Sequence, residues 1–316
     1  MNITVILCTY NRCQSLSRAL NSAAAQKLPE SVEWEVLVVD NNSNDQTPEV
    51  VREFCNRYPG RFRYICERQP GKSHALNAGI REARGDVLAF MDDDVTVAPS
   101  WLKNLTVTLL NGEWVGAGGR ILPGKNFSPP RWLSLKGPRG RYALAPLALF
   151  DLGEEPGQLA EPPFGANMAF RKEMFEKHGG FRTDLGPCPG SEIRNEDSEF
   201  GSRLLAEGER MRYEPSAIVY HPVSESRIQK EYHLAWWFDK GRADVRQFGI
   251  HPDAICILGI PLYLFRRLAV WTLRWMVTVE PPRRFQSKLA VWGKAGAIVE
   301  CYRRSSNEIK PRNDKN

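Results

Sequence analysis

The sequence of 316 residues lacks the signatures of several common protein classes. Its seven cysteines are odd in number and form no C-x-x-C pair, so the sequence indicates neither a disulfide framework nor a zinc site, and a reducing cytoplasm is the simplest location. No G-x-G-x-x-G follows the first apolar segment and no G-x-x-x-x-G-K-S/T occurs, which disfavours classical dinucleotide binding and P-loop chemistry. The apolar amino terminus has no basic leader and no long h-region, so we interpret it as a strand and not as a signal peptide.

An uninterrupted apolar run that is long enough to cross a membrane is also missing. Residues 255–279 form the most apolar part of the chain, but Arg266, Arg267 and Arg274 interrupt it, which disfavours a spanning helix. Basic residues mixed with tryptophan are instead typical of helices that lie in a membrane interface. We therefore expect peripheral membrane contact through residues 227–304, at the cytoplasmic face. A helical subdomain packed on a catalytic core is the alternative.

What the chain does contain is a repeated alternation of apolar and amphipathic segments. Hydrophobic residues make up 42% of the chain and charged residues 25%, which is ordinary for a globular protein. Four apolar, β-branched segments predict strands, at residues 3–8, 35–39, 62–66 and 87–91. Residues at helical spacing lie between them. This alternation predicts βαβ units and an α/β fold with a mainly parallel central sheet flanked by helices.

The fourth of these segments carries the most informative stretch of the chain. Val87–Met91 predicts a buried central strand, and Asp92, Asp93 and Asp94 follow it directly. Open α/β sheets bind their ligands at the carboxyl ends of the strands. Carboxylates favour hard divalent ions, which are commonly shared with substrate phosphates. The three aspartates therefore indicate a Mn²⁺ or Mg²⁺ site, and a solvated acidic turn is the alternative.

Two further positions, one at a strand end and one after a turn, carry groups that suit a nucleotide. Asp40 follows the second strand, where its carboxylate can accept hydrogen bonds from a base or a ribose; a turn-closing aspartate is the alternative. Lys72 follows Pro70-Gly71 and is placed to reach a phosphate, and a solvated lysine is the alternative. Together with the aspartates, these positions predict a nucleotide-binding α/β architecture.

Four segments of the chain carry a resemblance to a known family. They are Cys8-Thr9-Tyr10-Asn11-Arg12, Val38-Val39-Asp40-Asn41-Asn42-Ser43, Gly71-Lys72-Ser73-His74-Ala75-Leu76-Asn77-Ala78-Gly79 and Phe90-Met91-Asp92-Asp93-Asp94. In this order they resemble the motifs of family 2 glycosyltransferases. The resemblance covers roughly residues 3–222 and implies a GT-A fold, an inverting reaction, a nucleotide-sugar donor (a UDP-sugar is expected) and a divalent metal. It implies nucleotide contacts from Thr9, Tyr10, Asn11, Arg12, Asp40, Lys72, Asn77, Asp92 and Asp93. It also implies that Asp94 and Asp92 bind the metal.

The second half of the chain carries three further segments with candidate functional residues. Phe164–Arg171 resembles the family segment that lines the donor-sugar and acceptor pocket, which points to Gly165, Ala166 and Asn167. His221 ends a last predicted strand. Similar enzymes place a histidine near the metal there, so we treat it as a possible third metal ligand beside the alternative of a structural histidine.

The third segment, Asn195-Glu196-Asp197, supplies the candidate catalytic base. Sugar transfer requires the removal of a proton from the acceptor hydroxyl as it attacks the anomeric carbon. The segment matches the acidic base motif of the family, so we predict Asp197 as the base, with Glu196 second. Two acidic residues in the first turn of a helix are also favoured by the helix dipole, and this structural role is the alternative.

The expected domain organisation follows from these assignments. Residues 1–222 form the predicted catalytic domain, with a nucleotide-binding half at 1–111 and an acceptor and base half at 112–222. Residues 223–304 form a C-terminal helical extension, and the polar segment 305–316 is expected to be a disordered tail.

The expected activity is the transfer of one sugar from a nucleotide-diphosphate sugar to a hydroxyl of a glycan or lipid-linked acceptor in cell-surface polysaccharide synthesis. A sugar nucleotidyltransferase is the alternative enzyme, but it would ordinarily carry a glycine-rich first loop where this chain has Thr9–Arg12. A non-catalytic glycan- or nucleic-acid-binding protein is favoured only by the basic C-terminal third. We expect no nucleic-acid partner.

Overall fold

The computed structural model describes residues 2–125, 127–130, 132–133 and 144–309. The contacts within the chain divide it into two compact units. The first unit comprises Met1–Phe127, Ala148–Ser191 and Glu196–Val223, and the second comprises Ser128–Leu147, Glu192–Asn195 and Ser224–Asn316. The division of residues 1–222 into a nucleotide-binding half and an acceptor half stays a prediction.

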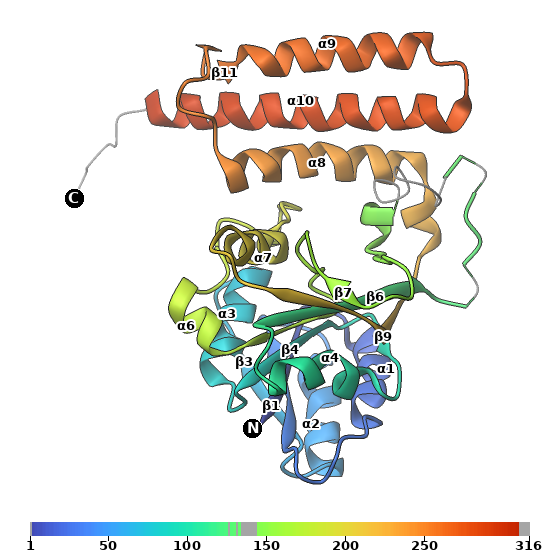
Figure 1. Ribbon diagram of the computed structural model, residues 1–316, viewed down its shortest axis with the longest axis vertical. Helices are drawn as coiled ribbons and strands as arrows, with labels where there is room; N and C mark the ends of the chain where they lie inside the picture. Colours follow the sequence, from blue (N-terminus) through green and yellow to red (C-terminus); the bar gives the residue numbers. More distant parts are fainter. Residues whose placement is uncertain (1, 126, 131, 134–143, 310–316) are drawn as a thin grey trace. The chain divides into compact units, whose positions relative to one another are not determined.

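The first unit is built on one nine-stranded sheet with helices packed against it (Figure 1). Its amino-terminal elements are β1 (Ile3–Thr9), α1 (Cys13–Ala24), β2 (Trp34–Asp40), α2 (Thr47–Arg57), β3 (Phe62–Cys66), α3 (Lys72–Glu82) and β4 (Val87–Asp92). The later elements are β5 (Thr96–Val97), α4 (Trp101–Leu110), β6 (Gly116–Pro123), β7 (Gly157–Gln158), β8 (Met168–Arg171), α6 (Glu173–His178), α7 (Glu196–Ala206) and β9 (Met211–His221). The strand order is β3-β2-β1-β4-β8-β6-β9-β5, and β7 pairs with β9.

The amino-terminal half of this sheet is parallel, as the sequence predicts. The strands β3, β2, β1 and β4 lie side by side and run in the same direction. Almost every residue of β1, β2 and β4 is buried, as expected for parallel strands that are covered on both faces. The register pairs Thr9 with Asp40 and Cys8 with Asp92. The polar residues at the ends of β1, β2 and β4 therefore meet at one edge of the sheet.

The second half of the sheet is mixed and contains an irregularity that a buried amide stabilises. β8 is antiparallel to both β4 and β6, and the β6–β9 register shifts between Gly119 and Arg120. A Cβ at Gly119 would lie 2.1 Å from the Ala217 carbonyl oxygen, so only glycine fits there. Asn167 Nδ2 donates to the carbonyls of Arg120 and Ala217 at 2.8 Å each, and Asn167 Oδ1 accepts from Trp101 Nε1 at 2.8 Å.

A cluster of phenylalanines packs α6 and α7 against the sheet. Phe90 of β4 and Phe170 of β8 contact Phe175 of α6, and Phe170 also contacts Phe200 of α7. The Phe175 and Phe200 rings stack with centroids 4.3 Å apart, and Phe181 contacts both. Each large aromatic side chain buried here contributes roughly 2–3 kcal/mol through the hydrophobic effect. The cluster therefore fixes the start of α7, and the acidic residues on it, relative to the end of β4.

The second unit consists mainly of three long helices. They are α8 (Lys230–Phe248), α9 (Leu262–Val277) and α10 (Pro281–Ile309), and α10 lies between the other two (Figure 1). The shorter elements are η1 (Ala145–Leu147), η2 (Glu225–Ile228), β10 (Cys256–Ile257) and β11 (Ile260–Pro261). A Cβ at Gly241 would lie 1.9 Å from the Gly293 carbonyl oxygen, and one at Gly296 would lie 1.9 Å from that of Phe238. These glycines therefore allow α8 and α10 to approach closely.

A buried ion-pair cluster and an aromatic cluster complete this helical unit. Glu300 is only 3% exposed and accepts from Arg246 Nε at 2.6 Å and from Arg242 Nε at 3.2 Å. The Trp132 ring lies 5.1 Å from the His233 ring and 4.8 Å from the Phe285 ring. The Trp132 side chain thus packs against residues of α8 and α10 within the second unit.

The helix α10 extends further than the sequence suggests. It continues through Ile309, so residues 305–309 are helical and not part of a disordered tail. Arg304 Nη1 donates to the Val245 carbonyl of α8 at 3.1 Å, and Cys301 is buried, so contacts with α8 hold this end of the helix. The rest of the expected tail, residues 310–316, lies outside the described residues. Among the helices that the structure describes, none is both long and apolar enough to span a bilayer.

Candidate active site

Asp40, which ends β2, is a fixed carboxylate at the edge where the strand ends meet. It is 1% exposed, and its carboxylate accepts from the Tyr64 hydroxyl at 2.8 Å and from the Ser43 N–H at 2.9 Å. Burial and the neighbouring Asp40 carboxylate raise the pKa of the Tyr64 hydroxyl, which therefore stays protonated and keeps donating. The predicted nucleotide contact of Asp40 stays a prediction, but its carboxylate is held in one position.

Arg12 joins two of the three consecutive aspartates. Its Nη1 lies 3.0 Å from Asp93 Oδ1 and 3.0 Å from Asp94 Oδ2, and half of the Arg12 side chain is exposed. Burial raises the pKa of Asp93 to about 6, although the Arg12 charge acts in the opposite direction. The guanidinium thus neutralises part of the negative charge that three adjacent carboxylates concentrate at the end of β4.

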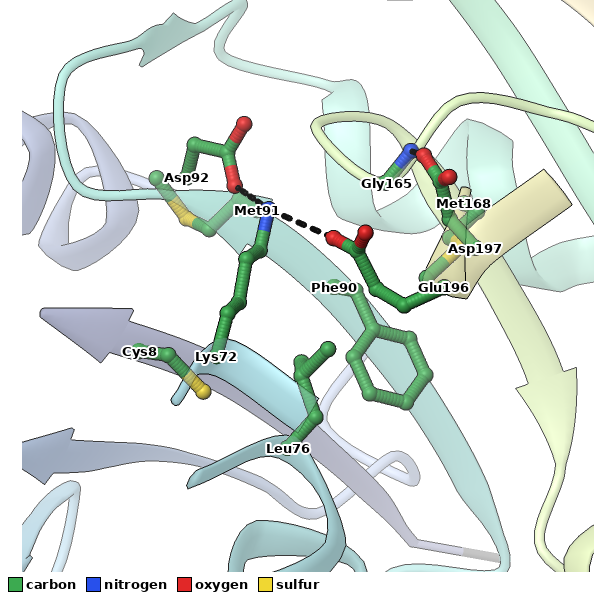
Figure 2. Close-up of a pocket in the computed structure, with 10 residues that line it drawn as sticks. All are labelled: Cys8, Lys72, Leu76, Phe90, Met91, Asp92, Gly165, Met168, Glu196 and Asp197. Carbon is green, nitrogen blue, oxygen red and sulfur yellow. Dashed lines mark hydrogen bonds and ion pairs between the residues drawn. The ribbon is translucent and has the colours of Figure 1, made fainter. Parts of the chain in front are cut away.

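Lys72, the first residue of α3, connects two carboxylates from different parts of the fold. Its Nζ lies 2.9 Å from Asp92 Oδ1 and 3.5 Å from Glu196 Oε1 (Figure 2). Burial acts to lower the Lys72 pKa, but the charges of Asp92, Glu196 and Asp197 outweigh it and raise this pKa well above its usual value. At Glu196 burial prevails and raises the pKa, whereas at Asp92 the Lys72 charge overcomes burial and lowers it. Lys72 is therefore a cation at neutral pH.

Asp197 lies in the first turn of α7, and two backbone N–H groups orient its carboxylate. Oδ2 accepts from the Gly165 N–H at 2.6 Å, and Oδ1 accepts from the Ser198 N–H at 2.7 Å. A Cβ at Gly165 would lie 3.0 Å from Asp197 Oδ2, so a larger residue would disturb this contact. The segment that resembles the donor-sugar pocket of the family therefore contacts the candidate base directly.

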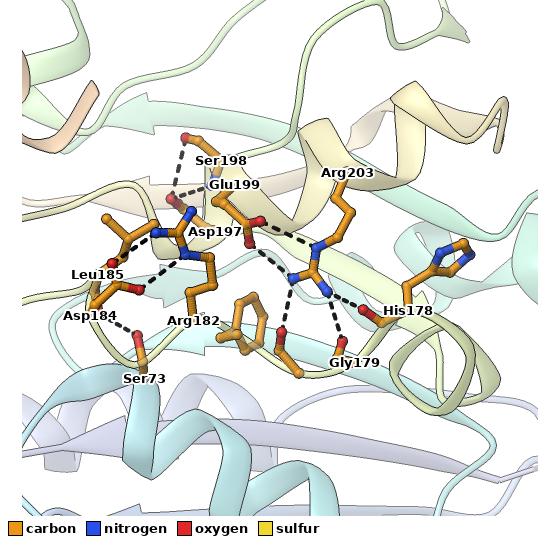
Figure 3. Close-up of polar contacts among 12 residues, drawn as sticks. Ser73, His178, Gly179, Arg182, Asp184, Leu185, Asp197, Ser198, Glu199 and Arg203 are labelled. Atoms are coloured by element: carbon orange, nitrogen blue, oxygen red, sulfur yellow. Dashed lines mark hydrogen bonds and ion pairs between the residues drawn. The ribbon is translucent and has the colours of Figure 1, made fainter. Parts of the chain in front are cut away.

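Arg203, one of the residues that the sequence analysis missed, anchors α7 to the turn after α6 (Figure 3). Its guanidinium binds the Glu199 carboxylate, with Nη2–Oε2 at 2.9 Å, and also donates to the carbonyls of His178 and Gly180. The side chain is a quarter exposed, so this contact is partly shielded from solvent. It fixes the axis of α7 and thereby the position of Asp197 at its amino terminus.

The groups from β4, α3 and α7 line one small pocket (Figure 2). The lining residues are Cys8, Lys72, Leu76, Phe90, Met91, Asp92, Gly165, Met168, Glu196 and Asp197. Asp92 lies on one side of the Lys72 ammonium, and Glu196 and Asp197 lie on the other. Burial raises the pKa of the Cys8 thiol, which disfavours an ionised sulfur nucleophile here. The pocket instead combines a cation with carboxylates on two sides, which suits an anionic leaving group opposite a base.

His221, the last residue of β9, lies beside the aspartates. The imidazole is buried, and its Nε2 lies 3.7 Å from Asp94 Oδ1. The β5–β9 and β6–β9 pairings bring the end of β9 to this place. The fold therefore places Asp94 and the histidine predicted as a third metal ligand next to each other, and their metal contact stays a prediction.

Two predicted binding residues use their side-chain amides within the protein. Asn77 Nδ2 donates to the Phe181 carbonyl and Asn77 Oδ1 accepts from the Phe181 N–H, both at 2.8 Å. Asn167 is fully buried in the sheet irregularity described above, and Ala166 beside it is 4% exposed. These amides hold the framework around the pocket. Contacts of Asn77 with a nucleotide, or of Ala166 and Asn167 with a sugar, stay predictions.

The loop after β1 carries the remaining predicted nucleotide contacts. Thr9 is buried at the strand end, with 4% of its surface exposed. Tyr10 is 45% exposed. Asn11 has a positive φ of 51° and joins the loops after β1 and β2, because its N–H donates to Ser43 Oγ and its Oδ1 accepts from the Asn44 N–H. The exposed Tyr10 ring is the part of this loop that is free to stack on a base.

Asn41 and Tyr64 are further residues that the sequence analysis did not assign. The Asn41 Nδ2 donates to the carbonyls of Glu67 and Gln69, and its Oδ1 accepts from the Gly71 N–H at 2.7 Å. Asn41 thereby shapes the loop that leads to Lys72. Its position within the motif after β2 is a signal in the sequence, whereas nothing there marks Tyr64 as the partner of Asp40.

The sheet order and the pocket together are those of an α/β protein with a charged site at the carboxyl ends of its parallel strands. The chain belongs to glycosyl transferase family 2, whose family model matches residues 4–179. It is 27% identical over 250 residues to glycosyltransferase AglE of Haloferax volcanii, covering 75% of each chain. It is also 27% identical over 237 residues to the succinoglycan biosynthesis protein ExoM of Rhizobium meliloti, covering 75% of this chain and 70% of that protein.

A solved structure has the same fold. The mannosyltransferase PcManGT from Pyrobaculum calidifontis, in complex with GDP-Man and Mn²⁺, superimposes with a TM-score of 0.56 and 21% sequence identity. The alignment covers 97% of this chain and 78% of that one. This likeness confirms the GT-A fold that the four motifs imply, and the family match confirms that the protein is a transferase.

Proposed function

We propose that this glycosyltransferase inverts the anomeric centre, depends on a divalent metal, and moves one sugar from a nucleotide-diphosphate sugar to a hydroxyl of a glycan or lipid-linked acceptor. The observation that carries the proposal is the pocket in which Lys72 separates Asp92 from Glu196 and Asp197. The related succinoglycan biosynthesis protein supports an acceptor of the cell-surface polysaccharide type. A UDP-sugar is the expected donor.

The donor occupies the edge where β1, β2 and β4 end. Asp40, fixed by Tyr64 and Ser43, accepts hydrogen bonds from the base or ribose. The ammonium of Lys72 binds the diphosphate, since a cation held among carboxylates can exchange one of them for a phosphate oxygen when the donor enters. Arg12, which is half exposed, offers a second cation at the same edge.

The residues around Asp94 fit a divalent cation that is shared with the substrate. No group of three or more His, Cys, Asp or Glu side chains that could hold a metal occurs in the part of the chain that the structure describes. Asp94 and His221 nevertheless present a carboxylate and an imidazole 3.7 Å apart, which suits Mn²⁺, and Asp92 ends β4 two residues before Asp94. Mg²⁺ and Mn²⁺ sites commonly take only one or two protein ligands plus phosphate oxygens. A cation bound there supplies positive charge that offsets the charge on the departing diphosphate.

The acceptor hydroxyl approaches from the side of α7. Asp197 takes its proton, because its carboxylate is oriented by the N–H groups of Gly165 and Ser198 and lies across Lys72 from Asp92. Glu196 keeps Lys72 in place and is the second candidate for the base. A base and a leaving group on opposite sides of the anomeric carbon give inversion.

The configuration of the released sugar tests this proposal. We expect the protein with Mn²⁺ to bind one nucleotide sugar of a panel of UDP- and GDP-sugars in a thermal-shift assay, and to release the nucleoside diphosphate slowly to water. At enzyme concentrations that make release faster than mutarotation, proton NMR of an α-linked donor shows the β-sugar first. Early release of the α-sugar, or release that is unchanged by EDTA, contradicts the mechanism. Pyrophosphate-dependent cleavage of the nucleotide sugar to a nucleoside triphosphate and a sugar 1-phosphate would indicate a nucleotidyltransferase instead.

Peripheral contact with the cytoplasmic face of a membrane is part of the proposal. The helix α9 exposes a row of large apolar side chains at helical spacing, and the seven cysteines are all unpaired, which supports a reducing compartment. We expect the protein to float with vesicles that contain phosphatidylglycerol, and a protein that stays at the bottom of the gradient contradicts the contact. The Leu273→Glu variant should float less, because it places a charge in the apolar row.

A further inference from the structure

The helical unit contains a groove that the transferase reaction does not use. The helices α8 and α9 both pack on α10, and between them lies a cavity of ≈ 860 Å³. All its lining residues belong to these three helices and the short segments that follow α8 and α9. A cavity of this size is within the range of sites for small organic ligands.

The charge of this groove is strongly positive. Arg267 and Arg274 of α9 and Arg283 and Lys294 of α10 line it, against a single carboxylate, Asp244. That carboxylate is already engaged, because Lys240 Nζ lies 2.5 Å from its Oδ1 and Asn195 Nδ2 donates to it. Within the described residues, Lys294 forms no ion pair, although it is only partly exposed. Arg283 pairs with Glu280 beside the groove, with Nε–Oε2 at 2.8 Å. Among the described residues no carboxylate pairs with Arg267, Arg274 or Lys294, so the groove keeps an excess of positive charge.

Apart from the polar residues Thr278, Gln286 and Ser287, the remaining lining is mainly apolar and aromatic. Trp237 and Val245 of α8, Tyr263, Leu264 and Trp271 of α9, and Leu289 and Ala297 of α10 contribute to it. The Arg274 guanidinium lies 4.9 Å from the centre of the Trp271 ring, and the Arg267 guanidinium lies 5.3 Å from that of Tyr263. Each guanidinium is thereby held over an aromatic face, which keeps its N–H groups available to an anion. The groove therefore combines guanidinium groups that can bind a phosphate with an apolar, aromatic lining.

A separate row of exposed apolar side chains runs along another face of α9. Leu262, Phe265, Ala269, Leu273 and Met276 follow one another at intervals of three or four residues and are exposed, Leu273 by 62% and Met276 by 70%. The groove residues Arg267, Trp271 and Arg274 lie on roughly the opposite face of the helix, because about 3.6 residues make one turn. The groove is therefore distinct from the apolar row proposed to contact the membrane.

We propose that this groove binds a lipid phosphate, with the phosphate group on Arg267, Arg274, Arg283 and Lys294 and the hydrocarbon chain along the tryptophan and tyrosine wall. The argument rests on the charge and the lining of the groove and does not depend on the catalytic assignments. The proposal concerns a ligand with both parts, because the cations alone would suit free phosphate and the wall alone would suit any apolar chain.

Three soluble probes separate these possibilities in isothermal titration calorimetry with the full chain. Monomeric dihexanoyl phosphatidic acid carries both an anionic headgroup and chains, inorganic phosphate carries only the charge, and dihexanoyl phosphatidylcholine carries the chains with no net charge. We expect phosphatidic acid to bind at least tenfold more tightly than either of the others. Equal affinity for inorganic phosphate would indicate a plain anion site, and equal affinity for phosphatidylcholine would indicate an apolar site; both outcomes overturn the proposal.

Two pairs of adjacent arginines provide a matched control. Arg267 and Arg283 line the groove, whereas the exposed neighbours Arg266 and Arg284 do not. The double variant Arg267→Gln/Arg283→Gln should lose at least tenfold in affinity for phosphatidic acid, and Arg266→Gln/Arg284→Gln should keep the affinity of the wild type. Both variants lose the same net charge, so equal effects would show unspecific attraction and contradict the groove. Nucleotide binding and the circular dichroism spectrum of each variant confirm that the chain is folded.

Discussion

The Asp197→Asn variant is expected to lose sugar transfer by about 1,000-fold, with donor binding retained. The magnitude is that of a general base, whose removal typically costs roughly 10²- to 10⁴-fold in rate. The amide keeps the shape of the side chain and one oxygen, which can still accept from Ser198 or Gly165. What the variant loses is the ability to take the acceptor proton. Turnover measured as nucleoside diphosphate release with acceptor, beside calorimetry with the nucleotide and Mn²⁺, separates the two effects.

Two other carboxylates of α7 serve as comparisons for this result. Glu196→Gln removes a partner of Lys72, so we expect it to change the KM for the donor more than the turnover. Glu199→Gln removes a charge from the same helical turn, but its amide oxygen can still accept from Arg203, which also keeps its bonds to the carbonyls of His178 and Gly180. The position of α7 is therefore retained, and the transfer rate should stay within a few-fold of the wild type. If Asp197→Asn turned over normally and Glu196→Gln did not, the base would be Glu196.

The parallel half of the sheet is predictable because its signals are local. A strand that is covered on both faces needs a continuous apolar run, and such runs occur at β1, β2 and β4. Polar residues must then follow at the strand ends, where the apolar environment stops. The parallel register brings Asp40 and Asp92 to the same edge without any further information. This part of the site therefore follows from the sequence alone.

The partners of the charged residues are not predictable in the same way. Lys72 and Glu196 meet because the phenylalanine cluster packs α7 against β4. The residues that neighbour Lys72 or Glu196 in the sequence do not predict this packing. The same holds for Arg12, which lies in a motif assigned to the nucleotide and here neutralises Asp93 and Asp94. Long-range pairing of charges depends on the tertiary structure, so the sequence indicates charged positions but not their contacts.

Amide side chains show a further limit of sequence analysis. An asparagine can donate and accept toward a ligand or toward the backbone with the same atoms. The motifs point to Asn77 and Asn167 as binding residues, and in the structure both bind backbone groups of the framework, while their ligand contacts stay predictions. A buried backbone group without a partner is costly, so such positions require an amide whether or not a ligand is bound. A motif asparagine therefore marks a position with a demanding backbone environment, and the sequence alone does not separate this role from a ligand contact.

Replacing Asp94 by Asn should abolish the metal dependence of donor binding and reduce transfer by about 1,000-fold. A Lewis acid that stabilises the leaving diphosphate is worth several kcal/mol, and roughly 4 kcal/mol corresponds to that factor. The amide is a much weaker ligand than the carboxylate, while the buried His221 beside it remains. The measurement is calorimetry of the nucleotide with Mn²⁺ and with EDTA, together with electron paramagnetic resonance of bound Mn²⁺, so the outcome does not depend on turnover.

Asp86→Asn provides the control for the Asp94 prediction, because Asp86 lies just before β4, at the opposite end of the strand. Its exposed carboxylate accepts from the Asn2 N–H at 3.1 Å, a contact that an amide oxygen can also make. This variant removes the same charge from the same region of sequence, so it should bind Mn²⁺ and donor like the wild type. If Asp94→Asn also retained Mn²⁺-dependent donor binding, the carboxylate would serve only to hold Arg12, and the metal site would have to be sought at Asp92. Comparison of the two variants thus decides whether the carboxylates at the end of β4 bind a metal cation or are only neutralised by Arg12.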